Sequence, residues 1–300
     1  MFIFFLLMGT LWFTSSNLFA KGEGTSSGNI FLEPNSARPA ALGEAFSAVS
    51  NDLSAFSYNP ASLKTLENGQ ASFLYEKGLF DTSYGNFMIG SPSKNDAFGL
   101  SVSYYNSGTI ELYDGSMNHT MNAKKDVALT LGYATKSENM LTGFSGKYLS
   151  SEVLGKKASA FAGDVGLQMP LTNSFRIGAA LQNIGTQLKY VHEANELPRM
   201  ARAGMSWNLI HGAYTTTLLL DASYFMNERE IKPAMGLETL VGPMSLRAGY
   251  QSRNDLQNFS FGAGFNLGQT TLDYSYALMK NFDVEHRVSL SFRFEELRKP

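Results

Sequence analysis

The end of this chain alternates apolar and polar residues with a period of two, and this pattern limits the possible folds more than any other feature. Apolar Val288, Leu290, Phe292 and Phe294 alternate there with polar Arg287, Ser289, Ser291 and Arg293. Successive side chains of a β-strand point to opposite faces, so the segment is predicted to be a strand with one apolar and one polar face. Residues 259–267 and 272–278 repeat the pattern.

The connections between the predicted strands alternate in length from residue 70 to residue 294. Short links are predicted at residues 91–95, 136–138, 170–173, 209–211, 241–243 and 268–269. Longer ones are predicted at residues 76–81, 106–123, 150–157, 184–198, 225–229, 252–256 and 279–284. Outer-membrane barrels have tight periplasmic turns, longer outer loops and an even number of strands. We therefore predict an all-β fold, a closed transmembrane antiparallel β-barrel of about fourteen strands over residues 70–295, with a short tail over 296–300.

The composition favours one barrel domain over a bundle of membrane helices. Of 300 residues, 44% are hydrophobic, but after the N-terminus no run approaches the roughly 20 apolar residues that a spanning helix needs. The formal net charge of −2 offers no basic surface for nucleic acid. The chain has no cysteine, which excludes thiol chemistry and disulfides.

The N-terminal residues predict export. An apolar run extends from Phe2 to Trp12, interrupted by Gly9 and Thr10, and is followed by polar residues and the small residue Ala20. We predict a cleaved signal peptide over residues 1–20 and a location in the bacterial outer membrane. The alternative is a membrane anchor, for which the apolar run is short.

Residues 21–69 differ in character from the rest of the chain. Residues 37–49 are rich in alanine and have helical spacing, with Pro39 in the first turn, which predicts a helix. Asn59 and Pro60 predict a turn into a second short helix. Because a barrel of about fourteen strands encloses more space than its own side chains fill, we expect this segment to lie in the lumen as a hatch. The alternative is a short amphipathic helix on the periplasmic side.

Ordered sequence motifs extend over nearly all of the chain after residue 30. The first covers residues 36–46, 51–52 and 58–63, and includes Arg38, Pro39, Gly43, Glu44, Asn51, Asp52, Asn59, Pro60 and Ala61. Others follow at residues 146–149, 162–167, 182–185, 246–250, 272–274 and 286–290. Together they resemble the motifs of the PorV/PorQ family of outer-membrane β-barrels, which belongs to a wider FadL-like group.

The resemblance implies a FadL-like barrel of about fourteen strands whose N-terminal hatch contains the turn at Asn59, Pro60 and Ala61. It also implies a role in type IX secretion, in which PorV and PorQ proteins handle secreted cargo, whereas FadL itself admits long-chain fatty acids. Three functions stay open: a cargo-binding or shuttle component of a secretion system, a channel for uptake or export of small hydrophobic molecules, and a structural barrel without transport. The corresponding partners are secretion proteins or cargo, a small hydrophobic ligand, and outer-membrane lipid around a monomeric barrel.

Polar residues on the inward phase of the strands are the candidate functional residues. They are Asp164, Arg176, Arg202, Arg247, Asp273 and Arg287. A barrel interior is polar by default, so lining the lumen or holding the hatch is their simplest role. We predict that Arg38 and Glu44 of the hatch pair with such inward residues. The four histidines are isolated and no nucleophile or phosphate-loop motif occurs, so the sequence predicts no enzyme, metal site or cofactor.

Overall fold

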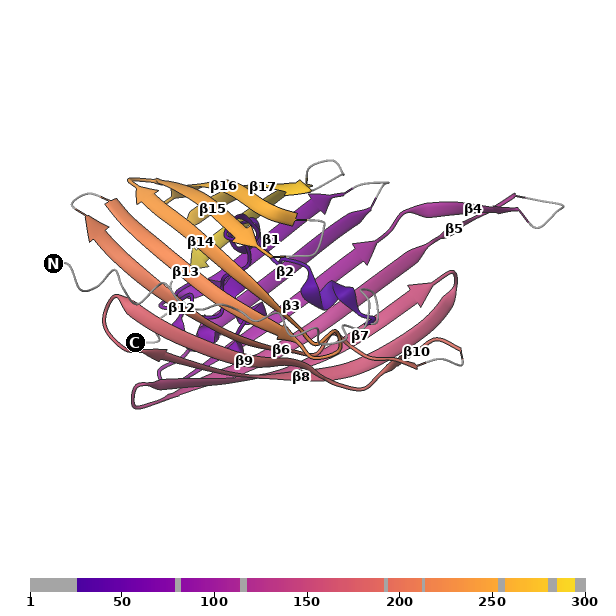
Figure 1. Ribbon diagram of the computed structural model, residues 1–300, viewed down its shortest axis with the longest axis horizontal. Helices are drawn as coiled ribbons and strands as arrows, with labels where there is room; N and C mark the ends of the chain where they lie inside the picture. The colour runs from indigo at the N-terminus through magenta and orange to yellow at the C-terminus, as the bar shows by residue number, and fades with distance from the viewer. Residues whose placement is uncertain are drawn as a thin grey trace, which may run out of the picture.

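The protein forms a closed antiparallel β-barrel of fourteen strands, shown as a computed structural model in Figure 1. The structure describes residues 26–78, 82–113, 118–191, 194–211, 214–252, 257–279 and 285–294. The barrel strands are β1 (Gly69–Lys77), β2 (Ser83–Pro92), β3 (Asp96–Asn106), β6 (Lys124–Ser137), β7 (Met140–Val153), β8 (Lys156–Pro170), β9 (Phe175–Gly185), β12 (Met200–His211), β13 (Tyr214–Phe225), β14 (Glu230–Val241), β15 (Met244–Gln251), β16 (Gln257–Leu267), β17 (Thr270–Met279) and β18 (Glu285–Phe294). β1 pairs with β18 along its whole length, from Gly69 opposite Phe294 to Lys77 opposite His286, and this pairing closes the barrel. The predicted fold class is confirmed.

The connections follow the predicted alternation in length with one clear exception. At one end, which we call the short-turn end, links of four residues or fewer join the strands. At the other, the long-loop end, the predicted link over residues 150–157 is wrong, because β7 continues to Val153 and β8 begins at Lys156. Only Leu154 and Gly155 remain between them, with φ angles of 49° and 75°. Two residues in this left-handed region form a two-residue hairpin turn, the shortest common connection between antiparallel strands. The polar residues that suggested a loop therefore belong to the ends of β7 and β8. The short link predicted at 209–211 is also displaced, since these residues are the end of β12.

Two of the long connections contain small hairpins of their own. β4 (Thr109–Tyr113) pairs with β5 (Asn118–Asn122), and Figure 1 shows this hairpin projecting beyond the barrel. β10 (Leu188–Lys189) pairs with β11 (Ala194–Asn195) close to the barrel mouth. The sequence predicts loops at both places but not this pairing.

Apolar side chains cover the outside of the barrel and polar side chains line the inside. Phe98, Leu131 and Phe161 expose 58%, 58% and 63% of their surface. By contrast, Arg287 and Ser289 on the inward phase of β18 are buried. This is the reverse of the distribution in a soluble protein, and it suits a wall that faces hydrocarbon.

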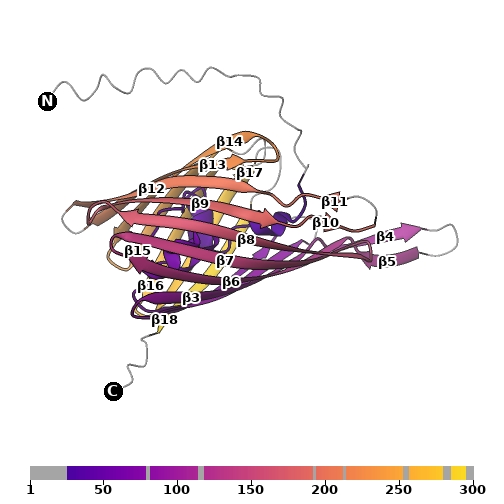
Figure 2. The same cartoon turned by 90° about the horizontal axis from the view of Figure 1, so that it is seen from below.

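The N-terminal segment lies inside the barrel (Figure 2). It contains η1 (Asn29–Leu32), α1 (Ala37–Ala41), η2 (Leu53–Ser57) and η3 (Pro60–Thr65). α1 contacts β15 to β18, whereas η3 contacts β2, β3, β6, β7 and β8 across the lumen. Of the helices in the described ranges, none is long and apolar enough to cross a membrane.

The segment passes through the lumen from one end to the other. At the long-loop end, Ser26 forms a bridge with Glu196 of the connection between β9 and β12. At the short-turn end, the chain leaves the lumen and enters β1 at Gly69. We call residues 26–66 the hatch. The alternative of a helix outside the barrel is wrong for these residues.

The predicted helix over residues 37–49 is wrong beyond its first turn. α1 ends at Ala41, and Gly43 and Glu44 both have a φ of 61°. Residues in this left-handed region end an α-helix. The apolar residues that follow are buried all the same, because the hatch is enclosed on every side.

The second predicted element is confirmed as the 3₁₀ helix η3. Asn59 is its N-cap, accepting a hydrogen bond from the backbone of Ala61, and Pro60 occupies the first position. Proline suits this position because the amide hydrogen that it lacks would have no partner within the helix. A local sequence signal thus specified this turn correctly.

Glycines on the lumen face let the hatch pack directly against the backbone of the wall. A Cβ atom added at Gly143 of β7 would lie 2.3 Å from the nitrogen of Ala61 and the carbonyl carbon of Pro60 in η3. One added at Gly178 of β9 would lie 2.2 Å from the carbonyl oxygen of Ser47. No real Cβ atom approaches other atoms this closely. The absence of side chains at these places therefore makes the room that the hatch occupies.

Gly143→Ala should destabilise the protein, because neither backbone segment can move by the width of a methyl group without disturbing its hydrogen bonds. We expect the free energy of unfolding to fall by about 1–3 kcal/mol, measured by urea denaturation of the detergent-solubilised barrel. Gly146→Ala on the same strand is the control, because a Cβ at Gly146 meets no atom within 4 Å. Equal stability of the two variants would contradict this account of the packing.

Candidate functional site

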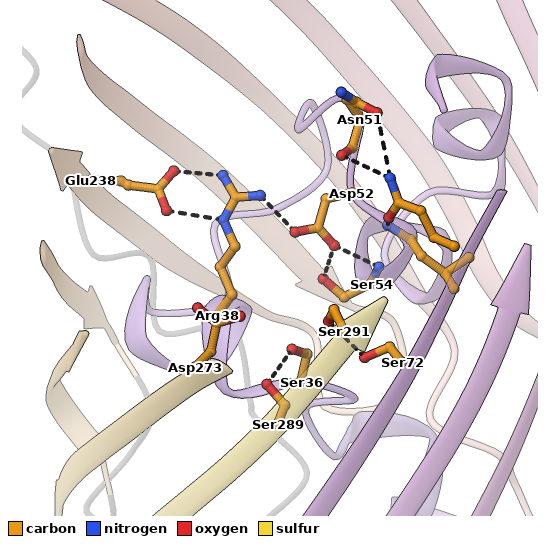
Figure 3. A network of polar contacts seen from close by, with 12 residues as sticks. Ser36, Arg38, Asn51, Asp52, Ser54, Ser72, Glu238, Asp273, Ser289 and Ser291 are labelled. Carbon is orange, nitrogen blue, oxygen red and sulfur yellow. Dashed lines mark hydrogen bonds and ion pairs between the residues drawn. The ribbon is translucent and has the colours of Figure 1, made fainter. Parts of the chain in front are cut away.

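Arg38 of α1 joins the hatch to the barrel wall, as Figure 3 shows. Its partner on the wall, Glu238, lies near the short-turn end of β14. Nε and Nη2 of Arg38 donate to the two carboxylate oxygens of Glu238, at 3.0 and 2.5 Å. Its Nη1 donates to Oδ2 of Asp52 at 2.6 Å. A bidentate arginine–carboxylate pair is among the strongest polar contacts in proteins. Arg38 thus binds both the wall and the next part of the hatch.

Two further charges extend this contact along the wall. Arg247 on β15 donates to Oε1 of Glu238 at 2.7 Å and to Oδ1 of Asp273 on β17 at 2.6 Å. We call Asp52, Arg38, Glu238, Arg247 and Asp273 the Arg38 cluster. Negative and positive groups alternate along it, so each buried charge has an opposite neighbour, as charges removed from water require. The predicted candidates Arg247 and Asp273 therefore meet the predicted hatch residues Arg38 and Asp52 in one group.

Asp52 holds η2 in place and stays ionised. Its Oδ1 accepts a hydrogen bond from the backbone nitrogen of Ser54 at 2.7 Å and another from the Ser54 hydroxyl. Burial acts to raise the pKa of the Asp52 carboxyl, but the Arg38 charge and the Ser54 hydrogen bonds outweigh it and lower the pKa below its ordinary value. At neutral pH, Asp52 is therefore a full negative charge opposite Arg38.

A polar cavity lies beside the Arg38 cluster at the short-turn end of the lumen. Its volume is about 230 Å³, and Gln70, Ser72, Asn266 and Arg293 line it together with members of the cluster. These residues lie near the short-turn ends of β1, β16 and β18. The space between the hatch and the short-turn end of the lumen is therefore lined mainly by polar residues.

Two asparagines of the N-terminal motif fix turns of the hatch. Asn51 has a φ of 55°, a left-handed conformation that asparagine tolerates better than most residues. The side-chain amide nitrogen of Asn59 donates to the carbonyl oxygens of Ser47 and Leu167, both at 2.9 Å. Leu167 belongs to β8, so this bond ties the turn to the wall.

Glu44 and Arg202 connect the hatch to β12. Nη2 of Arg202 lies 3.9 Å from Oε2 of Glu44, and Nη1 of Arg202 donates to the backbone oxygen of Glu44 at 3.2 Å. The guanidinium carbon of Arg202 lies 4.9 Å from the centre of the Tyr58 ring. Asp221 on β13 accepts hydrogen bonds from the backbone nitrogens of Phe46 and Ser47, at 3.0 and 2.9 Å. The hatch is thus bound on this side as well.

The remaining motif residues act through the backbone. The carbonyl oxygen of Pro39 accepts hydrogen bonds from the nitrogens of Leu42 and Glu44, at 3.1 and 2.9 Å. Gly43 lies against the backbone of Tyr250 on β15, where an added Cβ would be 2.5 Å from the carbonyl oxygen. These residues shape the hatch and present no chemical group to the lumen.

Other predicted lumen residues lie outside the Arg38 cluster. Arg287 donates to Glu76 at 2.6 Å in the upper part of the wall, on the long-loop side. Asp164 binds Lys147 at 2.8 Å. Arg176 stands at the short-turn end of β9, opposite Ser206 on β12. The inward arginines and aspartates therefore form several groups and not one site.

Glu238, Asp221 and Lys147 have central positions that the sequence analysis missed. Each belongs to the inward phase of its strand and is buried. That phase was readable from the alternation, but the partners were not, because Arg38 and Glu238 are 200 positions apart. Only closure of the barrel brings them together.

An apolar cluster fills the lumen on the long-loop side of the hatch. It consists of Ile30, Leu74, Tyr84, Ala128, Leu149, Ala158, Ala160, Leu188 and Leu197, with Phe31 and Tyr105 packed against it. We call it the upper apolar cluster. Ile30 comes from η1 of the hatch, and Leu188 and Leu197 come from the connection between β9 and β12.

The cations beside the upper apolar cluster bind carboxylates. Nζ of Lys147 lies 5.0 Å from the centre of the Phe31 ring and 2.8 Å from Asp164. Nζ of Lys124 lies 5.5 Å from the centre of the Tyr105 ring and 3.1 Å from Asp126. Both ammonium groups beside the cluster therefore already have a carboxylate partner.

The known proteins most informative about this arrangement share its fold but little of its sequence. No family model and no curated protein matches the chain. The toluene transporter TodX of Pseudomonas putida superposes with a TM-score of 0.64 at 13% identity, covering 87% of this chain and 98% of that one. A FadL homologue of Pseudomonas aeruginosa superposes with a TM-score of 0.59 at 12% identity, again over 87% and 98%. The barrel is therefore FadL-like in fold, whereas no comparison supports the narrower resemblance to PorV/PorQ.

Arg38→Ala should loosen the hatch, because it removes the contact between α1, Asp52 and Glu238. Breaking a buried ion pair costs about 3 kcal/mol or more, so we expect faster proteolysis within the hatch and higher permeability to small solutes in liposome-swelling assays. Lys157→Ala is the control, because the ion pair of Lys157 with Glu152 is exposed and both residues lie on the outward phase of their strands. If Arg38→Ala matched the wild type in both assays, the Arg38 cluster would not hold the hatch.

Proposed function

We propose that this protein is a channel of the bacterial outer membrane that admits small, uncharged hydrophobic molecules, with the hatch as its gate. The observation that carries the proposal is the upper apolar cluster. The lumen of an outer-membrane barrel is ordinarily polar, yet here apolar side chains fill its long-loop end, the end that faces outward in such barrels. The fold shared with TodX, a toluene transporter, supports the same reading.

The charge distribution favours an uncharged molecule over a fatty acid. A carboxylate that entered the upper apolar cluster would need a cation, and Lys147 and Lys124 beside it already bind Asp164 and Asp126. Burying a carboxylate without a new partner is costly. A neutral molecule has no such requirement and gains from leaving water.

Entry would require the hatch to move. Ile30 and Leu149 expose 4% and 0% of their surface, so the protein's own side chains occupy the space that a ligand would take. A ligand therefore competes first with η1. Passage further down requires release of the contacts around Arg38, since the hatch backbone touches the wall at Gly143 and Gly178. We expect binding at the upper end to precede movement of the rest of the hatch.

The location in the outer membrane belongs to the same proposal. An exterior of exposed leucine and phenylalanine side chains supports it, as do the tight turns at one end and long connections at the other. The signal peptide predicted over residues 1–20 and the tail predicted over 296–300 lie outside the described residues, and both stay predictions. We also propose the division into a hatch over residues 21–69 and a barrel over residues 70–295. The start of β1 at Gly69 supports it.

A role in secretion, with cargo or secretion proteins as partners, is the second candidate. The feature that favours it is the hairpin of β4 and β5, which projects beyond the barrel and exposes 74% of Tyr113, a surface that a protein partner could contact. Stoichiometric recovery of secreted cargo with the barrel, purified in mild detergent, would favour this role over the channel.

The channel is tested by uptake of radiolabelled toluene into cells that carry the protein in their outer membrane. Ala160→Phe places a large side chain in the space that the ligand would occupy within the upper apolar cluster. We expect this variant to lose most of the toluene uptake that the wild-type protein provides. Ser159→Phe on the same strand is the matched control, because Ser159 is exposed on the outward phase of β8. Equal uptake by the two variants, or acceleration of dodecanoate as strongly as toluene, would contradict the proposal. A protein that accelerates neither compound would be a structural barrel.

A further inference from the structure

A short part of the connection between β9 and β12 lies against the N-terminal end of the hatch. It consists of residues 196–199, and we call it the clasp. The backbone nitrogen of Ser27 donates to the carbonyl oxygen of Glu196 at 2.9 Å, and Ser26 forms a parallel bridge with the same residue. The hydroxyl of Ser26 also donates to Oε1 of Glu228 at 3.3 Å. The N-terminal end of the hatch is therefore held by contacts that do not involve the Arg38 cluster.

The clasp is itself fixed to the barrel wall from two directions. The side-chain nitrogen of Asn183 on β9 donates to the carbonyl oxygen of Pro198 at 2.9 Å. From the connection between β13 and β14, the side-chain nitrogen of Asn227 donates to the carbonyl oxygen of Leu197 at 2.8 Å. Nε of Arg199 donates back to Oδ1 of Asn227 at 3.2 Å. The clasp is thus part of the wall, so when the two separate it is the end of the hatch that moves.

Gly28 brings the end of the hatch into close contact with the clasp and with the upper apolar cluster. Its φ angle is 80°, a left-handed conformation that favours glycine. A Cβ atom added at Gly28 would lie 2.9 Å from Cδ2 of Leu197 and 3.0 Å from Cδ2 of Leu149. Both leucines belong to the upper apolar cluster, as does Ile30, two residues further along the hatch. Detachment of this end from the clasp would therefore open the cluster.

A change of backbone direction separates this end from the rest of the hatch. After η1, Glu33 has extended backbone with φ and ψ angles of −71° and 135°, and Pro34 follows it. From Asn35 onward the hatch is bound inside the lumen, where the side-chain nitrogen of Asn35 donates to the carbonyl oxygen of Ser54 at 2.8 Å. Residues 26–32 can therefore leave the clasp by rotation about Glu33 and Pro34 while the remainder stays in place.

The contacts at the two places differ in strength. Ser26 and Ser27 are uncharged and only half-buried. The net effect of one such hydrogen bond on an equilibrium is roughly a factor of 2 to 10. Breaking a buried ion pair, as at Arg38, changes an equilibrium by about 100-fold or more. The end at the clasp should therefore open far more often than the part held by the Arg38 cluster.

We propose that the hatch opens in two stages, and that residues 26–32 leave the clasp while the Arg38 cluster stays closed. The first stage opens the upper apolar cluster toward the long-loop end. The second stage is needed only for passage to the short-turn end. The barrel can then accept a molecule without a continuous path through the lumen. This use of the two stages rests on the proposed channel, whereas the detachment of residues 26–32 does not.

Gly28→Ala should open the first stage alone. Alanine at this φ angle is strained, which shifts the equilibrium roughly tenfold toward detachment. In the detergent-solubilised full-length barrel, we expect amide hydrogen exchange of residues 26–32 to accelerate about tenfold. Exchange of residues 53–65 should stay as in the wild type. Gly268→Ala is the matched control, because the φ angle of Gly268 is also 80° and an added Cβ meets no atom within 4 Å.

A disulfide should hold the first stage closed. The chain has no cysteine, and the bridge partners Ser26 and Glu196 are about 4.8 Å apart, within the range of a disulfide. We expect the oxidised variant Ser26→Cys/Glu196→Cys to lose most toluene uptake and to exchange more slowly over residues 26–32. Reduction of the same protein should restore both. The control, Ser150→Cys/Ser159→Cys, joins register partners of β7 and β8, and its oxidation should change neither property.

Three results would overturn the proposal. Exchange over residues 26–32 of Gly28→Ala could equal that of the wild type, or residues 53–65 could accelerate to the same extent, which would mean that the hatch opens as one piece. The oxidised Ser26→Cys/Glu196→Cys variant could also keep full uptake in a barrel that takes up toluene. If the wild type takes up no toluene, the channel fails, and the exchange measurements still decide whether the hatch opens in two stages.

Discussion

Pairing of β1 with β18 is the contact on which the rest of this structure depends. A sheet surrounded by hydrocarbon cannot leave the backbone groups of an edge strand without partners, so the barrel must close. The hatch precedes β1 directly in the chain, and closure therefore surrounds it. The same closure sets the strand phase that turns Glu238, Arg247 and Asp273 inward, toward Arg38. Without this pairing neither the lumen nor its contacts exist.

Two kinds of contact hold the hatch, and they differ in how they would give way. Glycines such as Gly143 and Gly178 bring the backbone of the hatch into close contact with that of the wall, which opposes any small displacement. The ion pairs of Arg38 and Arg202 act at single points, where a charge that lost its partner would be left in a poorly hydrated lumen. In the proposed channel, a gate held in this way would be closed by default and would open only when a whole segment of the hatch moved.

The two ends of the lumen have opposite character. The long-loop end is filled by apolar side chains, including Ile30 of the hatch itself, whereas the short-turn end contains a polar cavity next to Arg38. In the proposed channel, an apolar molecule would therefore bind on the long-loop side of the hatch and not on the short-turn side.

The sequence by itself indicated a barrel of about fourteen strands and the capped turn at Asn59 and Pro60, because alternation and turn chemistry are local properties. It left open whether the N-terminal segment lies in the lumen or outside it, and the tertiary structure decided for the lumen. The sequence analysis predicted a long loop where Leu154 and Gly155 form a tight turn, because the ends of β7 and β8 are polar. It also predicted too long a helix, because the left-handed backbone at Gly43 follows directly after α1. Tertiary structure alone decided which inward charges pair. Arg38 binds Glu238, which is 200 positions away in the sequence. Tertiary structure also decided that an apolar cluster fills the upper lumen. Such pairings depend on barrel closure and on strand register. These bring inward residues from distant parts of the sequence into contact, and no local pattern encodes them.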